Sequence, residues 1–400
     1  MWGFLTSLND ILVPHLKAIF DLNYAEVMLI QFSFFSAYFI FSLPSGKLID
    51  RIGYKRAMVV GLLTMGLGAL LFVPAAAVPS FPLFLAALMI LAAGITLLQV
   101  AANPYVTVLG PARTASSRLN LTQAFNSLGT TVAPYFGSLL ILSAAPKTTE
   151  ELRRMSAQVL QAYRLHEASS VKVPYMGLSL ALILLAVFIA AVNLPAIPEA
   201  ARSPSLRTPG ESVWKHRHLV LGAVAIFVYV GAEVAIGSFL VSYLGQPFIG
   251  GLPAKVAARL VSLYWGGAMI GRFIGSAVLQ KVRTGTVLAV AATGACLLVL
   301  TSVATTGHVA MWSILFVGVC NSIMFPSIFA LGVSGLGPLT GDGSGVLVMA
   351  IVGGAIIPEI QGGLADHIGI QYAFLLPAAC YVYIFYYALK GSRPAVNVEA

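Results

Sequence analysis

Apolar residues run along this chain in twelve stretches, separated by short clusters of glycine, proline and charged residues. A helix needs about 20 apolar residues to cross the hydrocarbon core of a bilayer, which is about 30 Å thick. The sequence therefore predicts an all-α integral membrane protein with twelve transmembrane helices. The predicted spans are residues 3–20, 27–49, 57–77, 81–109, 119–144, 173–195, 218–244, 256–280, 285–306, 309–333, 343–365 and 371–390.

The composition excludes an ordinary soluble enzyme. Of the 400 residues 58% are hydrophobic and 9% are charged, whereas about a quarter of the residues in a soluble chain are charged. The glycines form no P-loop and the six histidines have no HExxH spacing. The three cysteines, each inside an apolar segment, lack the spacing of metal ligands. We expect no metal, no cofactor and no enzymatic activity.

The basic residues set the expected orientation in the membrane. The net charge is +9, but the 23 Lys and Arg are scattered between spans, so nucleic acid is not an expected partner. Most of them fall in alternate loops, which the positive-inside rule assigns to the cytoplasm. We therefore expect a monomer in the lipid bilayer of the cell inner membrane, with both termini cytoplasmic. Segment 145–172 is the expected long polar outer loop, and a short leading tail before Met1 is expected to be missing.

An internal repeat predicts two related halves. Asn103-Pro104 recurs as Phe325-Pro326 at an offset of 222, Gly129 with Pro134 recurs as Gly353 with Pro358 at 224, and Gly46-Lys47 recurs as Gly271-Arg272 at 225. Similar offsets indicate duplicated six-helix bundles with a substrate site near the midplane between them. The expected organisation is an N-terminal bundle over 1–196, a cytoplasmic linker over 197–216 and a C-terminal bundle over 217–400.

The loop after the second span combines glycines with charges of both signs. A small residue permits close helix approach, and an acid can pair across a cytoplasmic gate whose inner side is held by cations. The string from Gly46 to Arg56 resembles the signature loop of major facilitator transporters, which reports on gating and not on substrate. The expected gating residues are Gly46, Asp50, Arg51, Gly53, Lys55 and Arg56.

Further segments resemble one transporter family within that superfamily. They are Trp2-Gly3, Leu8 to Leu12, Ala101 to Tyr105, Val108 to Pro111, Arg118 to Leu121, Gln123 to Gly129, Tyr229 to Glu233 and Phe325 to Gly337. The chain resembles the fucose/galactose/glucose symporters, and among them most the bacterial glucose/galactose transporters. The resemblance implies sugar uptake driven by an ion gradient. Residue composition and spacing by themselves indicate only a transporter built from two bundles.

Carboxylates inside spans need a partner or a function, because each costs at least about 2.5 kcal/mol to insert. Three lie inside predicted spans and are the expected ion-coupling residues: Asp10, Glu233 and Glu359. In the family the acid at the position of Asp10 is implicated in proton coupling. Fucose transporters carry a second acid at the position of Gln99, where this chain has an amide that exchanges no proton. For Glu233 a structural ion pair with Arg272 is an equally open alternative.

Sugar hydroxyls need amides or carboxylates to orient them and aromatic faces for the apolar side of the ring. Gln99 and Asn103 share one helical face, and Asn120 and Gln123 share another. The expected substrate-binding residues are Asn9, Gln99, Asn103, Asn120, Gln123, Asn126, Tyr229, Asn321 and Trp265. Amides also join membrane helices, so each of these residues has a structural alternative.

The sequence as a whole predicts a secondary transporter that imports a hexose, namely glucose or galactose and in second place fucose, by proton symport through alternating access. Three transport alternatives stay open, which are sodium coupling, uniport and the export of small molecules. A membrane-bound sensor or an enzyme acting on lipid-linked substrates is disfavoured, because neither a soluble signalling domain nor a catalytic constellation is visible.

Overall fold

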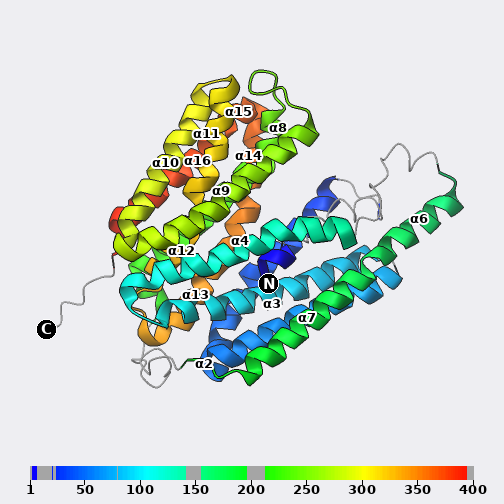
Figure 1. The fold of residues 1–400 in the computed structure, drawn as a ribbon, viewed down its shortest axis with the longest axis horizontal. Coiled ribbons are helices and arrows are strands. Elements are labelled where there is room, and N and C mark those ends of the chain that lie inside the picture. The colour runs from blue at the N-terminus through cyan, green and yellow to red at the C-terminus, as the bar shows by residue number, and fades with distance from the viewer. Residues whose placement is uncertain are drawn as a thin grey trace. The chain divides into compact units, whose positions relative to one another are not determined.

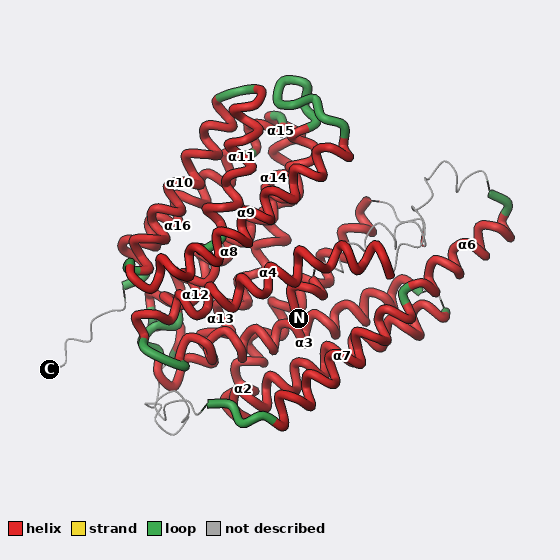
Figure 2. The backbone as a smooth tube through the Cα atoms, in the orientation of Figure 1, coloured by secondary structure: helices red, strands yellow, loops and turns green. Residues whose placement is uncertain are grey.

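The computed structural model describes residues 2–6, 20, 24–78, 80–140, 155–195 and 212–393. Within these ranges the chain forms helices joined by short loops and contains no strand (Figure 2). The longer helices are α2 (Tyr24–Ala77), α3 (Phe81–Val108), α4 (Ala115–Leu140), α6 (Ala157–Ser170), α7 (Lys172–Ala191), α8 (Arg217–Leu244), α9 (Ala254–Lys281), α10 (Thr284–Ala304) and α11 (Gly307–Asn321). They are followed by α12 (Met324–Gly332), α13 (Thr340–Met349), α14 (Gly353–Ile368), α15 (Ile370–Ala373) and α16 (Leu375–Tyr386).

Helix α2 contains two of the predicted spans, and a single residue separates them. Gly53 has φ 78° and ψ 164°, whereas its neighbours on both sides are helical. A side chain is strained at this φ whatever room surrounds it, and no atom lies within 4 Å of the place where a Cβ would stand. Conformation and not space therefore calls for glycine at this position. The expected gating loop is consequently a sharp bend between helical segments that hold Gly46 and Asp50 on one side and Lys55 and Arg56 on the other.

Eight stretches of the described chain are long and apolar enough to cross a membrane by length and composition. The stretch Leu29–Ala77 covers two predicted spans because it passes through Gly53. Helices α4 and α9 fall outside the eight, since α4 is rich in amide and hydroxyl side chains and α9 carries Lys255, Arg259 and Arg272. Most of the first predicted span, residues 7–19, lies outside the described residues.

The expected polar loop over 145–172 was a wrong prediction in its second half, where residues 157–170 form α6. This helix contacts α2 and α7. The sequence did not predict this helix, because Arg164, His166 and Glu167 make the segment too polar for a membrane span. A helix needs only one apolar face, and polarity therefore does not distinguish a surface helix from a loop.

The chain divides into two compact units. The first contains residues 1–102 and 126–195, and the second contains 103–125 and 196–400. This division differs from the predicted halves because residues 103–125 group with the second unit. The predicted linker over 197–216 lies largely outside the described residues, and α8 begins at Arg217. The assignment of the two bundles to 1–196 and 217–400 stays a prediction.

Close helix packing in the first unit depends on small residues. Helix α7 lies along α2 (Figure 1), and the ring of Tyr175 stacks on Phe72 with centroids 4.3 Å apart. Between α2 and α3, a Cβ on Gly94 would lie 2.5 Å from the main-chain nitrogen of Met65 and 2.7 Å from the carbonyl oxygen of Gly61. The two backbones approach so closely only because Gly94 has no side chain.

Helix α8 is the centre of the second unit, where it packs against α12, α14 and α16. A Cβ on Gly353 would meet the carbonyl oxygen of Phe227, and a Cβ on Gly231 would meet the side chain of Ile357. The residue numbers of these contacts rise together along both helices, so α8 and α14 run parallel. On the other side of the unit, α10 packs against α11 and α16 (Figure 1).

We expect Gly94→Ala to lower the free energy of unfolding of the detergent-purified protein by about 1–3 kcal/mol, because the added methyl group forces α2 away from α3. Gly177→Ala is the matched control, since Gly177 lies on α7 with no atom within 4 Å of its Cβ position. Alanine is also more favourable than glycine inside a helix by about 1 kcal/mol, so Gly177→Ala is not expected to lower the melting temperature. Thermal unfolding of both variants checks this, and equal melting temperatures would contradict the packing described for Gly94.

Candidate functional site

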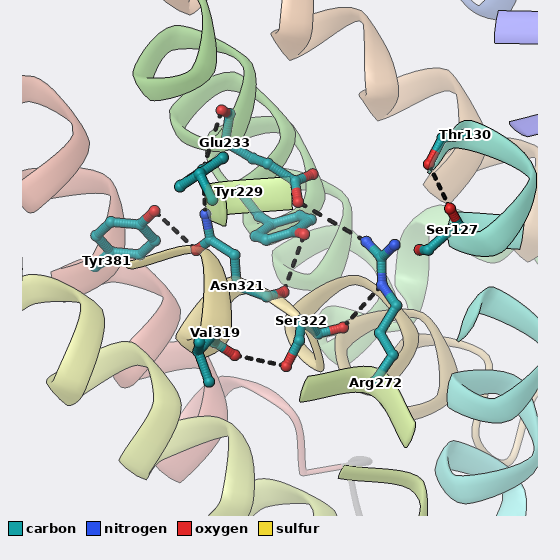
Figure 3. A network of polar contacts seen from close by, with 10 residues as sticks. Ser127, Thr130, Tyr229, Glu233, Arg272, Val319, Asn321, Ser322 and Tyr381 are labelled. Atoms are coloured by element: carbon teal, nitrogen blue, oxygen red, sulfur yellow. Dashed lines mark hydrogen bonds and ion pairs between the residues drawn. The ribbon is translucent and has the colours of Figure 1, made fainter. Parts of the chain in front are cut away.

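Asn321 is the centre of a buried polar cluster in the second unit. Its Nδ2 donates to the Tyr264 hydroxyl at 2.8 Å, and its Oδ1 accepts from the Tyr381 hydroxyl at 2.8 Å. Its main-chain oxygen accepts from the Tyr229 hydroxyl at 3.1 Å. Figure 3 shows Asn321 between Tyr229 and Tyr381. All four side chains are buried, so water does not reach their polar atoms. Hydrogen bonds within the cluster satisfy these atoms instead.

A helix break places Asn321 where these tyrosines reach it. Helix α11 ends at Asn321 and α12 begins at Met324. Pro326 has no N–H, so the Ser322 carbonyl lacks the donor that the next helical turn would supply. The Nε of Arg272 donates to that carbonyl at 3.2 Å instead (Figure 3). The proline therefore creates the acceptor that holds the arginine of α9.

Arg272 also faces the carboxylate of Glu233. Its Nη2 lies 3.8 Å from Glu233 Oε1, and the two side chains are 14% and 13% exposed. At this distance the two groups form an ion pair but no hydrogen bond. Glu233 Oε1 has no hydrogen-bond partner in the described chain, whereas its main-chain oxygen accepts from Tyr264 at 3.3 Å. The ion pair that the sequence left open for Glu233 is therefore present.

Polar contacts also join the beginning of α4 to the helices of the second unit. Asn120 Nδ2 donates to the Arg272 carbonyl at 2.7 Å. The Ser117 hydroxyl donates to the Ser276 carbonyl at 2.6 Å, and Thr284 donates to Ser116 at 3.0 Å. Asn120 is thus held on the same residue whose side chain faces Glu233. Its Oδ1 is buried and has no hydrogen-bond partner in the described chain.

The structure brings together two amides that the sequence placed on separate helical faces. Gln123 Nε2 on α4 donates to Asn103 Oδ1 on α3 at 3.3 Å. Asn103 Nδ2 is buried and has no hydrogen-bond partner among the described residues. In the first unit, buried Gln99 donates from Nε2 to the Tyr38 hydroxyl at 3.0 Å. A neighbouring side chain therefore orients each of these amides.

The remaining predicted site residues are dispersed. Asn126 is half-buried, and its Oδ1 accepts from the main-chain nitrogen of Gly3 at 2.7 Å. Trp265 and Glu359 are exposed. Asn9 and Asp10 lie outside the described residues. Their substrate-binding and ion-coupling roles stay predictions.

Sequence reasoning missed Tyr381 and Gln361, and it used Arg118 only as a loop cation and as part of the family resemblance. Arg118 donates to the carbonyls of Val106 and Thr107 at the end of α3, at 3.1 and 2.7 Å, and so satisfies acceptors that lack a helical donor. Arg118 lies in the first turn of α4, and a basic residue next to the loop that follows α3 was the available signal. Tyr381 lies among other aromatic residues in the last span and gave no such signal. Within the described ranges, no group of three or more His, Cys, Asp or Glu is placed to hold a metal ion.

Comparison with known proteins gives a family for this arrangement. The Major Facilitator Superfamily profile matches residues 2–358, and the chain belongs to that superfamily. The predicted class, an all-α multi-pass membrane protein with the major facilitator fold, is confirmed.

Two relatives and one solved structure are similar to the chain over nearly its whole length. The chain is 56% identical over 393 residues to the glucose/galactose transporter of Brucella abortus biovar 1 (strain 9-941), covering 98% of this chain and 92% of the relative. It is 38% identical over 403 residues to the L-fucose-proton symporter of Escherichia coli (strain K12), covering 99% and 92%. The crystal structure of the transporter FucP in the outward conformation superposes with a TM-score of 0.89 at 37% identity, covering 97% of this chain and 95% of that one. The predicted resemblance to these transporters is confirmed.

We expect Asn321→Ala to destabilise the protein by about 2–4 kcal/mol, because it leaves the buried hydroxyls of Tyr264 and Tyr381 without partners. Gln246→Ala is the control, since Gln246 is half-buried and its side chain donates to the Ser242 carbonyl four residues earlier, at 3.2 Å. Thermal unfolding in detergent measures both changes. If Asn321→Ala melted no lower than Gln246→Ala, the cluster would contribute nothing to stability.

Proposed function

We propose that this protein imports a hexose together with protons across the inner membrane of a bacterium, by alternating access. The supporting observation is the 56% identity over nearly the whole chain to a glucose/galactose transporter. The likeness to an L-fucose-proton symporter supports the coupling ion. A transporter and not an enzyme is also what the sequence predicts. Both termini are cytoplasmic in this proposal, and the protein works as a monomer.

Glu233 is the proposed proton carrier of the second unit. It lies near the middle of α8, where a carboxylate needs either a cation or a proton to offset the loss of water. Arg272 at 3.8 Å supplies the cation in this structure. A proton that binds Glu233 neutralises the carboxylate and so weakens its attraction to Arg272. The Arg272 side chain stays in place because its Nε still donates to the Ser322 carbonyl. Release of the proton on the cytoplasmic side restores the ion pair.

The other ion-coupling and binding roles follow the sequence predictions. Asp10 is the proposed carrier of the N-terminal half, and Glu359 is a further carboxylate on α14. Gln99 exchanges no proton, and its bond to Tyr38 presents an ordered amide to a sugar hydroxyl. The proposed substrate residues also include Asn103 and Gln123, whose mutual bond leaves Asn103 Nδ2 available as a donor.

Gating in this proposal acts at the bend of α2. Gly53 changes the chain direction between Asp50 and Arg51 on one side and Lys55 and Arg56 on the other. Charges placed at a helix bend near the membrane surface can form and break pairs without entering the hydrocarbon core. We assign the closing of the cytoplasmic side to this segment together with Gly46.

Uptake of labelled D-glucose, D-galactose and L-fucose into proteoliposomes tests the proposed function. We expect an inward proton gradient to drive at least one hexose above its outside concentration in the absence of sodium. Accumulation that requires sodium would replace the proton by sodium. Equilibration without accumulation under either gradient would indicate uniport. Exclusion of all three sugars would overturn hexose import and return the exporter alternative.

We expect Glu233→Gln to abolish hexose accumulation while keeping exchange of labelled for unlabelled hexose across the membrane. The amide keeps the shape of the side chain but cannot take up and release a proton, so sugar still crosses without coupling. Asp366→Asn is the matched control, because Asp366 is an exposed acid near the end of α14. Accumulation by Glu233→Gln at the level of the wild type would remove Glu233 from the coupling mechanism.

A further inference from the structure

Gln361 is a buried amide that the proposed site has not used. It lies on α14 with 0% of its surface exposed. Among the described residues, neither Nε2 nor Oε1 has a hydrogen-bond partner. Other buried amides of the described chain use at least one of their two atoms, as Asn103, Asn120 and Asn321 do. Gln361 alone among the described buried amides has both atoms unpartnered.

The parallel packing of α8 and α14 places Gln361 close in level to the carboxylate of Glu233. Ile357 of α14 packs at Gly231 of α8, and a Cβ on Gly362 would lie 3.5 Å from the ring of Phe239. Gln361 is one helical turn beyond Ile357 and lies between these two contacts. Glu233 lies between the same contacts on α8, and its Oε1 also lacks a hydrogen-bond partner in the part of the chain that the structure describes. Two polar side chains with unmet bonding capacity thus stand at neighbouring levels of adjacent helices.

Burial of this amide without a partner carries an energetic cost. Each unsatisfied buried donor or acceptor costs about 1–3 kcal/mol, and methionine would fill a similar volume without that cost. A partner that offsets the cost must both accept from Nε2 and donate to Oε1. A cation binds the oxygen only and leaves the N–H groups unsatisfied. A sugar hydroxyl, like a water molecule, donates and accepts through one oxygen, so it matches both halves of the amide.

The backbone around Gln361 can let the amide reach such a partner. Pro358 stands three residues earlier inside α14 and removes the N–H that would bond to the Gly354 carbonyl. Gly362 and Gly363 follow directly, and a Cβ on Gly363 would meet no atom within 4 Å. Helices bend at proline and at glycine pairs. The turn that carries Gln361 is therefore bounded on both sides by residues that permit bending.

We propose that Gln361 is a substrate-binding residue, whose amide donates from Nε2 to a hexose hydroxyl and accepts at Oε1 from the same or an adjacent hydroxyl in the loaded transporter. This inference rests on the proposed function, because it assumes that the substrate is a hexose. It adds to the substrate site a residue on α14, a helix for which sequence reasoning named only Glu359.

Hexose binding by the detergent-purified full chain tests the proposal, with Gln361→Met as the first variant and Gln361→Leu as the second. We expect Gln361→Met to weaken hexose binding about tenfold, as the loss of a hydrogen bond to substrate does. We also expect its melting temperature without sugar to equal or exceed that of the wild type, because the costly amide is gone. Unchanged affinity in either folded variant overturns the proposal.

Gln371→Leu is the matched control. Gln371 is partly buried, and its Nε2 donates to the carbonyls of Ser302, Val303 and Thr305 at 3.3, 3.0 and 2.8 Å. Its loss is expected to lower the melting temperature and to leave hexose affinity unchanged. The two glutamines should therefore respond in opposite ways. A loss of stability in Gln361→Met like that in Gln371→Leu would mean that Gln361 is structural.

Deoxy sugars distinguish a direct contact from an indirect one. Hexose analogues that each lack one hydroxyl are titrated into the wild type and into Gln361→Met. We expect the analogue without the contacted hydroxyl to bind the wild type about tenfold more weakly than the parent sugar, and the variant to show no such difference. Equal losses in both proteins for every analogue overturn the direct contact. If the wild type binds no hexose at all, the proposed function fails and this inference fails with it.

Discussion

A bilayer offers no hydrogen bonds, and this constraint orders the polar side chains of the whole chain. The cluster around Asn321 satisfies it most completely, because one residue pairs with three tyrosine hydroxyls through its side chain and its carbonyl oxygen. Polar groups satisfied in this way hold helices together. The groups that the described chain leaves without a hydrogen-bond partner, among them Glu233 Oε1 and the Gln361 amide, are the ones that a proton or a sugar would satisfy.

Interruptions of the helices determine where the polar groups meet. Pro326 withdraws the donor from the Ser322 carbonyl, and Arg272 takes its place. The same arginine faces Glu233 with its side chain and receives Asn120 on its carbonyl oxygen. One residue of α9 therefore connects a carboxylate to the beginning of α4. A change of charge at Glu233 acts on a residue that is already part of the helix packing.

Much of the fold was predictable from the sequence, because lipid selects for long apolar stretches that composition reveals directly. The spans over 81–109, 218–244 and 285–306 agree with α3, α8 and α10 within a few residues. Helix α6 was not predictable in this way, since its polarity resembles that of a loop. The residue types of the candidate site came from the sequence, but the sequence placed Asn103 and Gln123 on separate helical faces and did not predict that they meet.

The sequence did not predict which buried polar groups have hydrogen-bond partners. A sequence shows that Asn321 and Gln361 are amides inside apolar stretches. It does not show that both amide atoms of Asn321 are hydrogen-bonded, or that neither amide atom of Gln361 has a partner among the described residues. That difference depends on Tyr264 and Tyr381, which come from helices far apart in the chain. Residue spacing identifies neighbours along one helix, whereas satisfaction of a buried group is decided by side chains from other helices.

Sugar-triggered pH change in proteoliposomes tests the central claim most directly, because it reports the substrate and the coupling ion in one trace. D-glucose, D-galactose or L-fucose is added outside vesicles that contain the purified protein, in a weakly buffered medium without sodium. Proton-coupled hexose import predicts that the outside medium becomes alkaline when a transported sugar is added. Hexose uptake with no pH change would contradict it.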